Sequence, residues 1–366
     1  MTTSADPATE ADVPVRRPPV DVVVPFAGSE DELWSLVARA SKLVLGPQDT
    51  IVVVDNGGRR NRGAPGGPRG ASVAPGGPRE PPPPGGPREP PPPGGPREPS
   101  PPGGPREPPP PGGPRVRVLE ASERRSSYHA RNRGAAAGQA PWLLFLDADV
   151  DWPPNLIDAY FDSEPGERVA VLAGGITDAP TANSSRATAA ERYAAESHPM
   201  AQINTLGEPR HPPYAQTANC LVRRAAFESV GAFADGIRSG GDADLCFRLQ
   251  ADGWTVEPRE AAGVVHRNRR ALIALLAQKA RHGAGAAWLA ERYPGAFPRR
   301  RWTGLAAWSV RSIRAGRRRG SGGASMAVVD VLAVWAFELG RLLPNRPRPL
   351  LPNQTRPPRP NQTRTQ

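Results

Sequence analysis

The chain has 366 residues, enough for one large domain or two small ones, and 38% of them are hydrophobic. Its formal net charge at pH 7 is +11, and nearly all of the positive charge is arginine, because only two residues are lysine. The arginines are dispersed without an aromatic stacking platform, which argues against a nucleic-acid-binding protein. Neither Cys220 nor Cys246 belongs to a Cys-x-x-Cys pair, which argues against a zinc site, and reduced thiols are typical of a cytoplasmic protein.

The N-terminal part of the chain predicts a parallel βαβ unit. Residues 1–19 contain acidic residues and no apolar stretch, so we expect a disordered N-terminus without a signal peptide. Apolar runs predict buried strands at Val20–Pro25 and Ile51–Val54, with a helix over Ser29–Leu45 between them that ends at Gly46-Pro47. Two strands joined by a helix through short connections are expected to pair in parallel.

A proline- and glycine-rich repeat then interrupts the pattern. The motif Pro-Gly-Gly-Pro-Arg recurs from Pro65 to Arg115 and settles to a nine-residue period. Such a segment cannot form a core, and proline cannot donate to a strand ladder, so residues 59–115 are predicted to be a flexible, partly polyproline II insertion. Neutral repeat expansion in a surface loop is one interpretation, and a spacer or a docking ligand for an SH3-like partner is the other.

The next predicted strand ends in two closely spaced acids. After a strand at Val116–Leu119 and a helix over Ser127–Gly138, the apolar run Leu143–Leu146 leads into Asp147-Ala148-Asp149. Residues two apart in an extended chain point the same way, so both carboxylates can reach one place at the C-terminal edge of the sheet. Oxygen ligands there suit Mg²⁺ or Mn²⁺, whereas the alternative is a solvated turn after a buried strand.

Alternating strands and helices continue to residue 266, although Ala179–Pro213 is polar and hard to assign. The predicted elements are a helix at Pro154–Phe161, a strand at Val169–Ala173, a helix at Thr188–Glu196, a strand at Ala218–Val222, helices at Arg224–Val230 and Leu245–Ala251, and short strands at Thr255–Glu257 and Gly263–His266.

Arginine-rich helices are predicted after residue 267, at Leu272–Ala290, Arg299–Ile313 and Met326–Leu343. The last is mostly apolar, but three charged residues fall near one face, so it is predicted to be amphipathic rather than transmembrane. It could pack on the domain, pair with another chain, or lie on the inner face of the membrane, with residues 299–343 making a peripheral contact. Residues 346–366 are predicted to form a disordered tail.

Seven short motifs occur in an order that resembles the family 2 glycosyltransferases, including actinobacterial members. They are Val22–Pro25, Val54–Gly57, Ala130–Gly134, Phe145–Asp149, Thr217–Asn219, Val230–Phe233 and Gly241–Leu245. The resemblance covers residues 20–295. It implies an α/β GT-A fold, which is a Rossmann-like, mostly parallel central sheet flanked by helices, followed here by a helical region at 296–345.

The resemblance also implies transfer of a sugar from a nucleotide-diphosphate donor to an acceptor hydroxyl, with inversion at the anomeric carbon. Asp149 would hold Mg²⁺ or Mn²⁺, His266 would complete the metal shell, and Asp147 would contact the ribose or assist the metal. The remaining implied donor contacts are Asp55 at the nucleotide base, Arg131 near the phosphates, and Pro25 and Asn219 in the donor-binding motifs. For His266 the alternative is an ordinary histidine at a strand end.

Asp242 matches the catalytic aspartate of the family and would take the proton from the acceptor hydroxyl. Because it opens a helix, the helix dipole and free N–H groups are expected to lower its pKa. Asp244 is the competing candidate base, simple helix capping is the alternative for both, and Arg248 is expected to form a structural ion pair with Asp244. The chain departs from the family where Gly241 replaces the usual glutamate, where Asn56 replaces a second acid, and where Phe-Ala-Gly follows Pro25.

Two other classes of protein share features with this sequence. A sugar-phosphate nucleotidyltransferase has a similar architecture, but no glycine-rich phosphate loop follows the first strand. A non-catalytic transferase-like scaffold that uses the proline-rich tract for docking is the alternative to an enzyme. The sequence does not identify the donor sugar or the acceptor.

Overall fold

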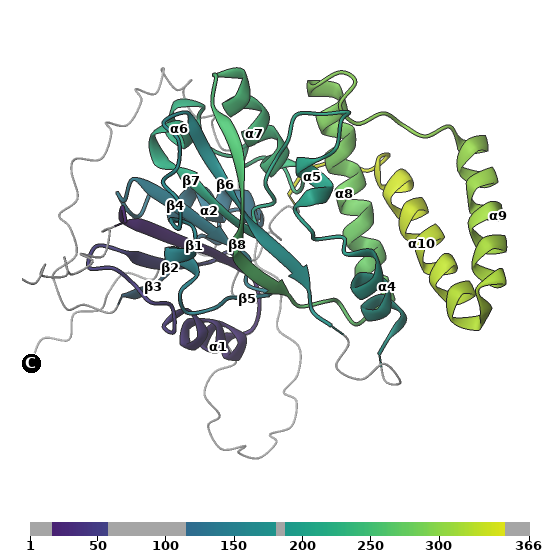
Figure 1. Cartoon of the computed structure of the whole chain (residues 1–366), viewed down its shortest axis with the longest axis horizontal. Helices are drawn as coiled ribbons and strands as arrows, with labels where there is room; N and C mark the ends of the chain where they lie inside the picture. The colour runs from purple at the N-terminus through teal and green to yellow at the C-terminus, as the bar shows by residue number, and fades with distance from the viewer. Residues whose placement is uncertain (1–16, 58–114, 181–186, 348–366) are drawn as a thin grey trace, which may run out of the picture. The chain divides into compact units, whose positions relative to one another are not determined.

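The computed structural model describes residues 17–57, 115–180 and 187–347. Within these ranges one eight-stranded sheet has the order β3-β2-β1-β4-β7-β6-β8-β5, with helices on both faces (Figure 1). The predicted disordered N-terminus, the proline- and glycine-rich insertion and the C-terminal tail lie almost wholly outside the described residues, so these expectations stay predictions.

One half of the sheet is parallel, as the βαβ pattern predicted. Its strands are β1 (Val20–Phe26), β2 (Thr50–Asp55), β3 (Val116–Glu120) and β4 (Trp142–Leu146). All of the β1–β2, β2–β3 and β1–β4 pairings are parallel. Strands β1 and β4 are buried along their whole length, because helices cover both faces and consecutive apolar residues can then alternate between two cores.

The other half of the sheet reverses direction twice. Strand β7 (Asn219–Arg223) is antiparallel to both β4 and β6 (Val169–Asp178). Strand β8 (Thr255–His266) is parallel to β6, and the short β5 (Val150–Asp151) pairs with its end. Two reversals restore the original direction, so the carboxyl ends of β6 and β8 lie at the same edge as those of β1, β2 and β4.

The first two helices pack on opposite faces of the sheet. Helix α1 (Glu30–Ala40) begins with a capping box between Ser29 and Glu32, and it packs with Val22 and Val24 in one core. Helix α2 (Ser127–Ala135) packs on the other face, where a side chain at Gly134 would collide with Val23 and Val54. The prediction that the first helix extends to Leu45 is wrong, since the chain turns out of the helix after Ala40.

The remaining helices follow the predicted order, with one short addition at α5. They are α3 (Leu156–Ala159), α4 (Ala189–Ser197), α5 (Ile203–Leu206), α6 (Arg224–Ser229), α7 (Gly241–Ala251), α8 (Leu272–Arg292), α9 (Trp302–Arg318) and α10 (Gly320–Gly340). Helix α10 packs against α8, α9 and α4, and Figure 1 shows α8, α10 and α9 in sequence away from the sheet.

The two short strands predicted at Thr255–Glu257 and Gly263–His266 are one continuous strand, β8. Proline cannot donate a hydrogen bond to a strand ladder, but β8 continues through Pro258, which pairs with Ala173. Extra residues of β8 between Arg259 and Val264 bulge where β6 advances from Gly174 to Ile176. The strand therefore carries His266 to the edge of the sheet without a loop.

Candidate active site

Most of the acids and bases singled out in the sequence follow strands that end at one edge of the sheet. Asp147 and Asp149 come directly after β4, Asp55 is the last residue of β2, and His266 is the last residue of β8. Pro25 is buried one residue before the end of β1 and pairs with Val54. Open α/β sheets bind ligands at this edge, so the strand directions alone place these residues on one side of the molecule.

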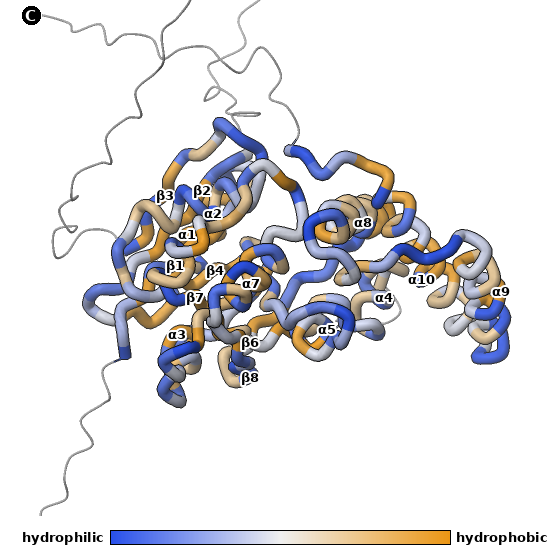
Figure 2. The backbone as a smooth tube through the Cα atoms, turned by 90° about the horizontal axis from the view of Figure 1, so that it is seen from above, coloured by the Kyte–Doolittle hydropathy of each residue, from blue (hydrophilic) through white to orange (hydrophobic). Residues whose placement is uncertain are grey.

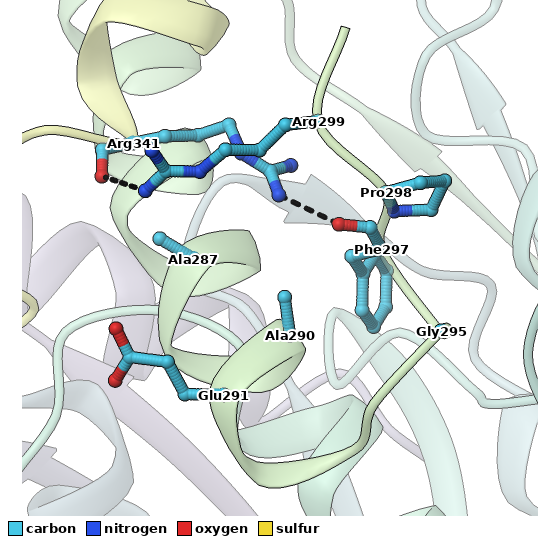
Figure 3. Close-up of a pocket in the computed structure, with 8 residues that line it drawn as sticks. All are labelled: Ala287, Ala290, Glu291, Gly295, Phe297, Pro298, Arg299 and Arg341. Atoms are coloured by element: carbon cyan, nitrogen blue, oxygen red, sulfur yellow. Dashed lines mark hydrogen bonds between the residues drawn. The ribbon is translucent and has the colours of Figure 1, made fainter.

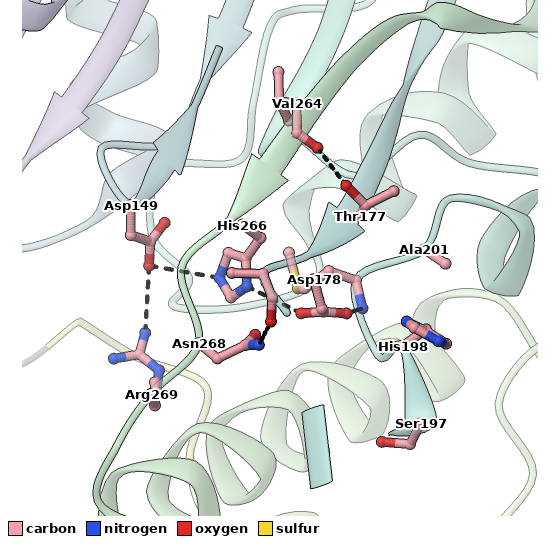
Figure 4. Close-up of polar contacts among 12 residues, drawn as sticks. Asp149, Thr177, Asp178, Ser197, His198, Ala201, Val264, His266, Asn268 and Arg269 are labelled. Carbon is pink, nitrogen blue, oxygen red and sulfur yellow. Dashed lines mark hydrogen bonds and ion pairs between the residues drawn. The ribbon is translucent and has the colours of Figure 1, made fainter. Parts of the chain in front are cut away.

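Asp149, His266 and Asp178 form a chain of polar contacts at the edge (Figure 4). The Nε2 atom of His266 is 3.7 Å from Oδ2 of Asp149, and Nδ1 is 3.2 Å from Oδ1 of Asp178. Because a carboxylate only accepts hydrogen bonds, Asp178 fixes the proton on Nδ1 and leaves Nε2 directed toward Asp149. A carboxylate that orients a histidine in this way is a common outer shell of protein metal sites.

The charges of Asp149, His266 and Asp178 shift the pKa values at this edge of the sheet. Burial lowers the pKa of His266, but hydrogen bonds to Asp149 and Asp178 and their charges outweigh burial and raise that pKa to about 10. Burial alone would raise the pKa of Asp149, yet the hydrogen bond and the charge of His266 give a net lowering. A protonated imidazole thus provides the positive charge here, and binding of a cation at Nε2 would require loss of that proton.

The donor set fits a hard divalent cation that shares its shell with a substrate. Within the described ranges, no group of three histidine, cysteine or acidic side chains is arranged to hold a metal ion. Asp149 and His266 could supply two ligands. Mg²⁺ and Mn²⁺ sites commonly use few protein ligands and fill the remaining positions with water and substrate phosphate oxygens.

Asp147 is held by an arginine from helix α2. The guanidinium of Arg131 is 2% exposed and forms an ion pair with Asp147. Burial raises the pKa of Asp147, the charge of Arg131 lowers it, and the nearby charge of Asp149 raises it again, leaving a net increase. Arg131 therefore fixes the first acid of the Asp-Ala-Asp motif in place.

Asp242 lies in the first turn of α7, within the electrostatic reach of Asp147 and Arg131. Gly240 has φ of +87°, and its turn brings the chain into the helix. The Oδ1 atom of Asp242 accepts a hydrogen bond from the Ala243 N–H at 3.1 Å and from the Tyr128 hydroxyl at 3.4 Å. The ring of Tyr128 lies beneath Arg131, at 5.6 Å from the guanidinium carbon to the ring centre. Tyr128 and Arg131 thus connect Asp242 to Asp147.

The expected direction of the Asp242 pKa shift is wrong. The backbone N–H of Ala243 does lower the pKa, but burial has the larger effect and leaves it above its usual value. The charge of Asp147 also raises the pKa of Asp242, which shows that the two carboxylates share one electrostatic environment. A half-buried carboxylate with a raised pKa is better suited to accept a proton than a fully solvated one.

Asp244 has a different environment. It is fully buried and bonds to Arg248 at 2.9 Å, to Arg292 at 2.9 Å and to the Tyr293 hydroxyl at 2.8 Å. The expected ion pair with Arg248 is confirmed. With both oxygens engaged by cations and a hydroxyl, Asp244 ties α7 to the end of α8.

Two predicted donor contacts differ in their surroundings. Asp55 is half-buried, and its Oδ1 accepts a hydrogen bond from the Gly57 N–H at 2.9 Å, so the carboxylate remains at the open edge. Asn219 is 0% exposed, donates to the carbonyls of Gly175 and Ala262, and accepts from Tyr160. Asn219 joins β6, β7 and β8 and has no exposed atom facing the cluster.

Sequence reasoning missed Asp178 and Tyr128. Asp178 ends β6, five residues beyond the predicted strand, and its role depends on the pairing of β6 with β8. Tyr128 lies at the start of a helix that was predicted, but only its neighbour Arg131 belonged to a motif. A polar residue at a strand end was the signal for Asp178, whereas no sequence signal indicated Tyr128.

Tyr128 also explains why residue 241 is glycine. A Cβ atom at Gly241 would lie 2.8 Å from the ring carbons of Tyr128, closer than packed carbons approach. We expect Gly241→Glu, which restores the residue usual in the family, to destabilise the protein by about 1–3 kcal/mol through overpacking. Chemical denaturation measures this loss, and the double variant Gly241→Glu with Tyr128→Ala should recover part of it. Equal stability of Gly241→Glu and the wild type would contradict this packing.

Cationic side chains from α8 and from the segment before it face the same cluster. Arg269 lies 3.9 Å from Asp149 and bonds to Gln278 of α8 at 3.1 Å. Arg281, three residues further along α8, is half-buried and has no carboxylate ion pair in the described part of the chain. One turn later, Gly285 is pressed against Ser239, next to the turn that precedes Asp242. Arg281 therefore lies between the Asp149–His266 pair and the candidate base Asp242.

The neighbouring cations also lower the pKa of His282. Burial and the charges of Arg281, Lys279 and Arg269 lower its pKa to about 3. The unfolded chain would take up this proton near pH 6.5, so stability should fall as the pH drops from about 6.5 toward the folded value, with a slope near 1.4 kcal/mol per pH unit. The free energy of unfolding, measured by denaturation at several pH values, should fall less steeply toward acid pH for His282→Gln than for the wild type. Equal pH dependence in the two proteins would contradict the lowered pKa of His282.

A separate hollow of about 350 Å³ lies between α8 and the segment that leads to α9 (Figure 3). Two arginines close it by bonding to backbone carbonyls, Arg341 to Phe297 at 2.6 Å and Arg299 to Arg341 at 3.4 Å. None of the acids at the sheet edge lines it. We regard this hollow as packing space in the helical region.

The fold and the acid-lined edge define the GT-A class of nucleotide-sugar transferase. Comparison with family models matches residues 142–334 to glycosyl transferase family group 2. The match covers more than half of the chain, and the protein belongs to this family of glycosyltransferases.

Relatives of known name agree. The chain is 29% identical over 213 residues to the pre-mycofactocin glycosyltransferase of Mycobacterium tuberculosis, covering 56% of this chain and 44% of that protein. It is 31% identical over 139 residues to glycosyltransferase AglE of Haloferax volcanii, covering 38% of this chain and 43% of that protein. The chain thus spans less than half the length of either relative.

Among solved structures, the mannosyltransferase PcManGT from Pyrobaculum calidifontis is similar, with a TM-score of 0.54 and 14% sequence identity. The superposition covers 90% of this chain and 88% of that one. At this identity the likeness confirms the GT-A fold. The predicted fold class and the predicted family are both confirmed.

Proposed function

We propose that this glycosyltransferase moves a sugar from a nucleotide-diphosphate donor to an acceptor hydroxyl, with inversion and with dependence on Mg²⁺ or Mn²⁺. The observation that supports this most is the Asp149–His266–Asp178 chain at the same sheet edge as Asp242. The similar mannosyltransferase was solved with GDP-Man and Mn²⁺, which agrees with a nucleotide-sugar donor and a divalent cation.

On the donor side, Asp149 and the Nε2 atom of His266 would hold the cation, and Asp178 keeps the imidazole in the tautomer that this requires. A bound divalent cation would neutralise the charge that grows on the diphosphate as the sugar–phosphate bond breaks. Arg131 holds Asp147 beside this position. Asp55, at the end of β2, is the carboxylate available to a nucleotide base, and Pro25 forms the adjacent strand end.

On the acceptor side, Asp242 is the base. The acceptor oxygen attacks the anomeric carbon, the bond from that carbon to the diphosphate breaks, and the hydroxyl proton passes to a carboxylate oxygen of Asp242. The Tyr128 hydroxyl and the Ala243 N–H hold this carboxylate from one side and leave its other oxygen for the acceptor. Asp244 is excluded from this role by its buried ion pairs.

Arg281 and Arg269 supply positive charge on the α8 side of the site. Both act electrostatically near the acids, since Arg269 lowers the pKa of Asp149 and the charges of Asp147 and Tyr128 reach Arg281. A half-buried arginine without an acidic partner is a suitable contact for a phosphate oxygen. We therefore assign Arg281 to the diphosphate of the donor, whereas Arg269 lies beside Asp149.

The non-catalytic alternative rests on the proline- and glycine-rich tract, which lies outside the described residues. One experiment distinguishes the scaffold from the enzyme. The purified full chain is incubated with a panel of nucleotide sugars, with Mn²⁺, Mg²⁺ or a chelator, and thermal protection and donor hydrolysis are measured. The proposal expects metal-dependent protection by one donor type, and NMR of the product should show the inverted anomer once an acceptor is found. No protection by any donor in the presence of metal would favour the scaffold.

A further inference from the structure

Helix α10 and the residue after it bury charged side chains, while apolar side chains of the helix are exposed. Its charged residues face the protein, since Glu338 and Arg341 are each 5% exposed and lie 3.8 Å apart. Apolar residues of α10 are open: Val328, Leu332 and Leu339 are 39–50% exposed, and Leu342 and Leu343, just after the helix, are 62% and 55% exposed. The three helical positions are four and seven residues apart, so they lie on one side of the helix, and together with Leu342 and Leu343 we call them the α10 stripe.

The inner face of α10 is anchored to the domain. Val329 and Ala333 pack with Leu275 of α8 and Tyr193 of α4, and Gly340 lies against the backbone of α8 at Ala280. The expectation that this segment packs on the domain is therefore confirmed for the inner face. The outer face stays uncovered in the described structure.

The stripe is long and apolar enough to interact with a lipid bilayer. Residues Gly322–Gly340 have a mean hydropathy of 1.5, and only 22% of this window is buried, unlike the core helix of a globular domain. Figure 2 shows α10 coloured largely as hydrophobic, between α8 and α9. Soluble monomers seldom expose so continuous an apolar surface.

The neighbouring helix α9 adds positive charge and interfacial aromatic residues. The turn between α9 and α10 carries the exposed residues Arg317, Arg318 and Arg319. Trp302 is 48% exposed and stacks on Trp335 with ring centres 5.8 Å apart. Arginine and tryptophan beside an apolar stripe match the headgroup level of an anionic membrane, where guanidinium groups meet lipid phosphates and indole rings lie at the boundary.

We propose that the outer face of the α9–α10 hairpin binds the surface of an anionic lipid bilayer, with the α10 stripe among the acyl chains and the arginines of the turn at the lipid phosphates. The positive charge of the α9–α10 turn favours an anionic lipid surface over a second copy of this chain, because two such arginine-rich turns would repel each other. Because the inner face of α10 is held by α8 and α4, the helix lies along the bilayer as part of the catalytic domain.

The test is flotation of the full chain with lipid vesicles. The wild type should float with mixed phosphatidylcholine/phosphatidylglycerol vesicles, float poorly with pure phosphatidylcholine, and be released in part by high salt. Leu332→Glu with Leu339→Glu, at exposed positions, should lower binding at least about tenfold. Replacing Arg317, Arg318 and Arg319 with glutamine should remove the preference for the anionic lipid.

The matched control is Trp34→Glu with Val44→Glu, which changes two other exposed apolar residues, 56% and 53% exposed, in and after α1. It should float like the wild type. Thermal melting checks that each variant is folded. Equal flotation of the leucine variant and the control would overturn the proposal. So would a wild-type dimer in light scattering that the leucine variant converts to a monomer while neither protein binds vesicles.

Discussion

Asp149→Ala is expected to abolish the metal dependence of nucleotide binding and to lower sugar transfer by about a hundred- to a thousandfold. Asp149 lies 3.7 Å from Nε2 of His266, and together they are the pair of side chains that fits a divalent cation at the sheet edge. Without the carboxylate, the negative charge on the departing diphosphate would lack its counter-charge. Calorimetric titration with UDP or GDP, with and without Mn²⁺, measures the effect directly.

Asp151→Ala is the matched control for this change. Asp151 is only two residues further on and pairs with Arg267 at 2.6 Å on the solvent side, with its side chain 52% exposed. Its loss should leave nucleotide binding and transfer within a few-fold of the wild type, because exposed ion pairs contribute little. Metal-dependent binding that survives in Asp149→Ala would show that the cation, if required, is held elsewhere.

Asp242→Asn is expected to lower kcat by about a hundred- to ten-thousandfold while donor binding stays unchanged. The wild-type rate depends on the charged carboxylate, and burial places its pKa above the usual value. Activity should therefore fall as the pH drops through that raised pKa, and this acid limb should be missing from the residual activity of Asp242→Asn. A pH profile of kcat/KM for both proteins tests the sign as well as the size of the effect.

Asp244→Asn separates catalysis from stability. Asp244 is buried between Arg248, Arg292 and Tyr293, so its neutralisation leaves cations without their partner and should destabilise the fold by about 3 kcal/mol. The kcat of the folded fraction should change far less than in Asp242→Asn. If Asp244→Asn lost transfer at unchanged stability and Asp242→Asn kept it, the two roles would be reversed.

The sequence was sufficient to predict the parts of the fold that follow from short-range pattern. Runs such as Leu143–Leu146 predict buried parallel strands, and acids directly after them are placed at a ligand-binding edge by strand direction alone. The helix that begins after Ser29 likewise follows from the local spacing of its apolar residues, although it ends at Ala40. These features need no knowledge of which distant segments meet.

The features that were missed depend on tertiary contacts. Asp178 reaches His266 because β6 and β8 pair in parallel and end at the same edge, and Tyr128 reaches Asp242 because α2 and α7 pack on the same face. The pKa of Asp242 was predicted in the wrong direction because burial outweighs the local N–H groups. In α10 the pattern indicated an amphipathic helix, but only the packing against α8 shows that its charged side faces inward.

The arrangement proposed for catalysis has two parts that act on one bound donor. Asp149 and His266 would hold the cation, and Asp242 would accept the proton. Anomalous diffraction from crystals grown with Mn²⁺ and UDP or GDP tests it most directly. One manganese peak is expected, coordinated by Asp149, by Nε2 of His266 and by diphosphate oxygens, with the Asp242 carboxylate on the acceptor side of the bound donor. A bound nucleotide whose diphosphate lies away from Asp149, or a manganese peak that neither residue touches, would contradict the account.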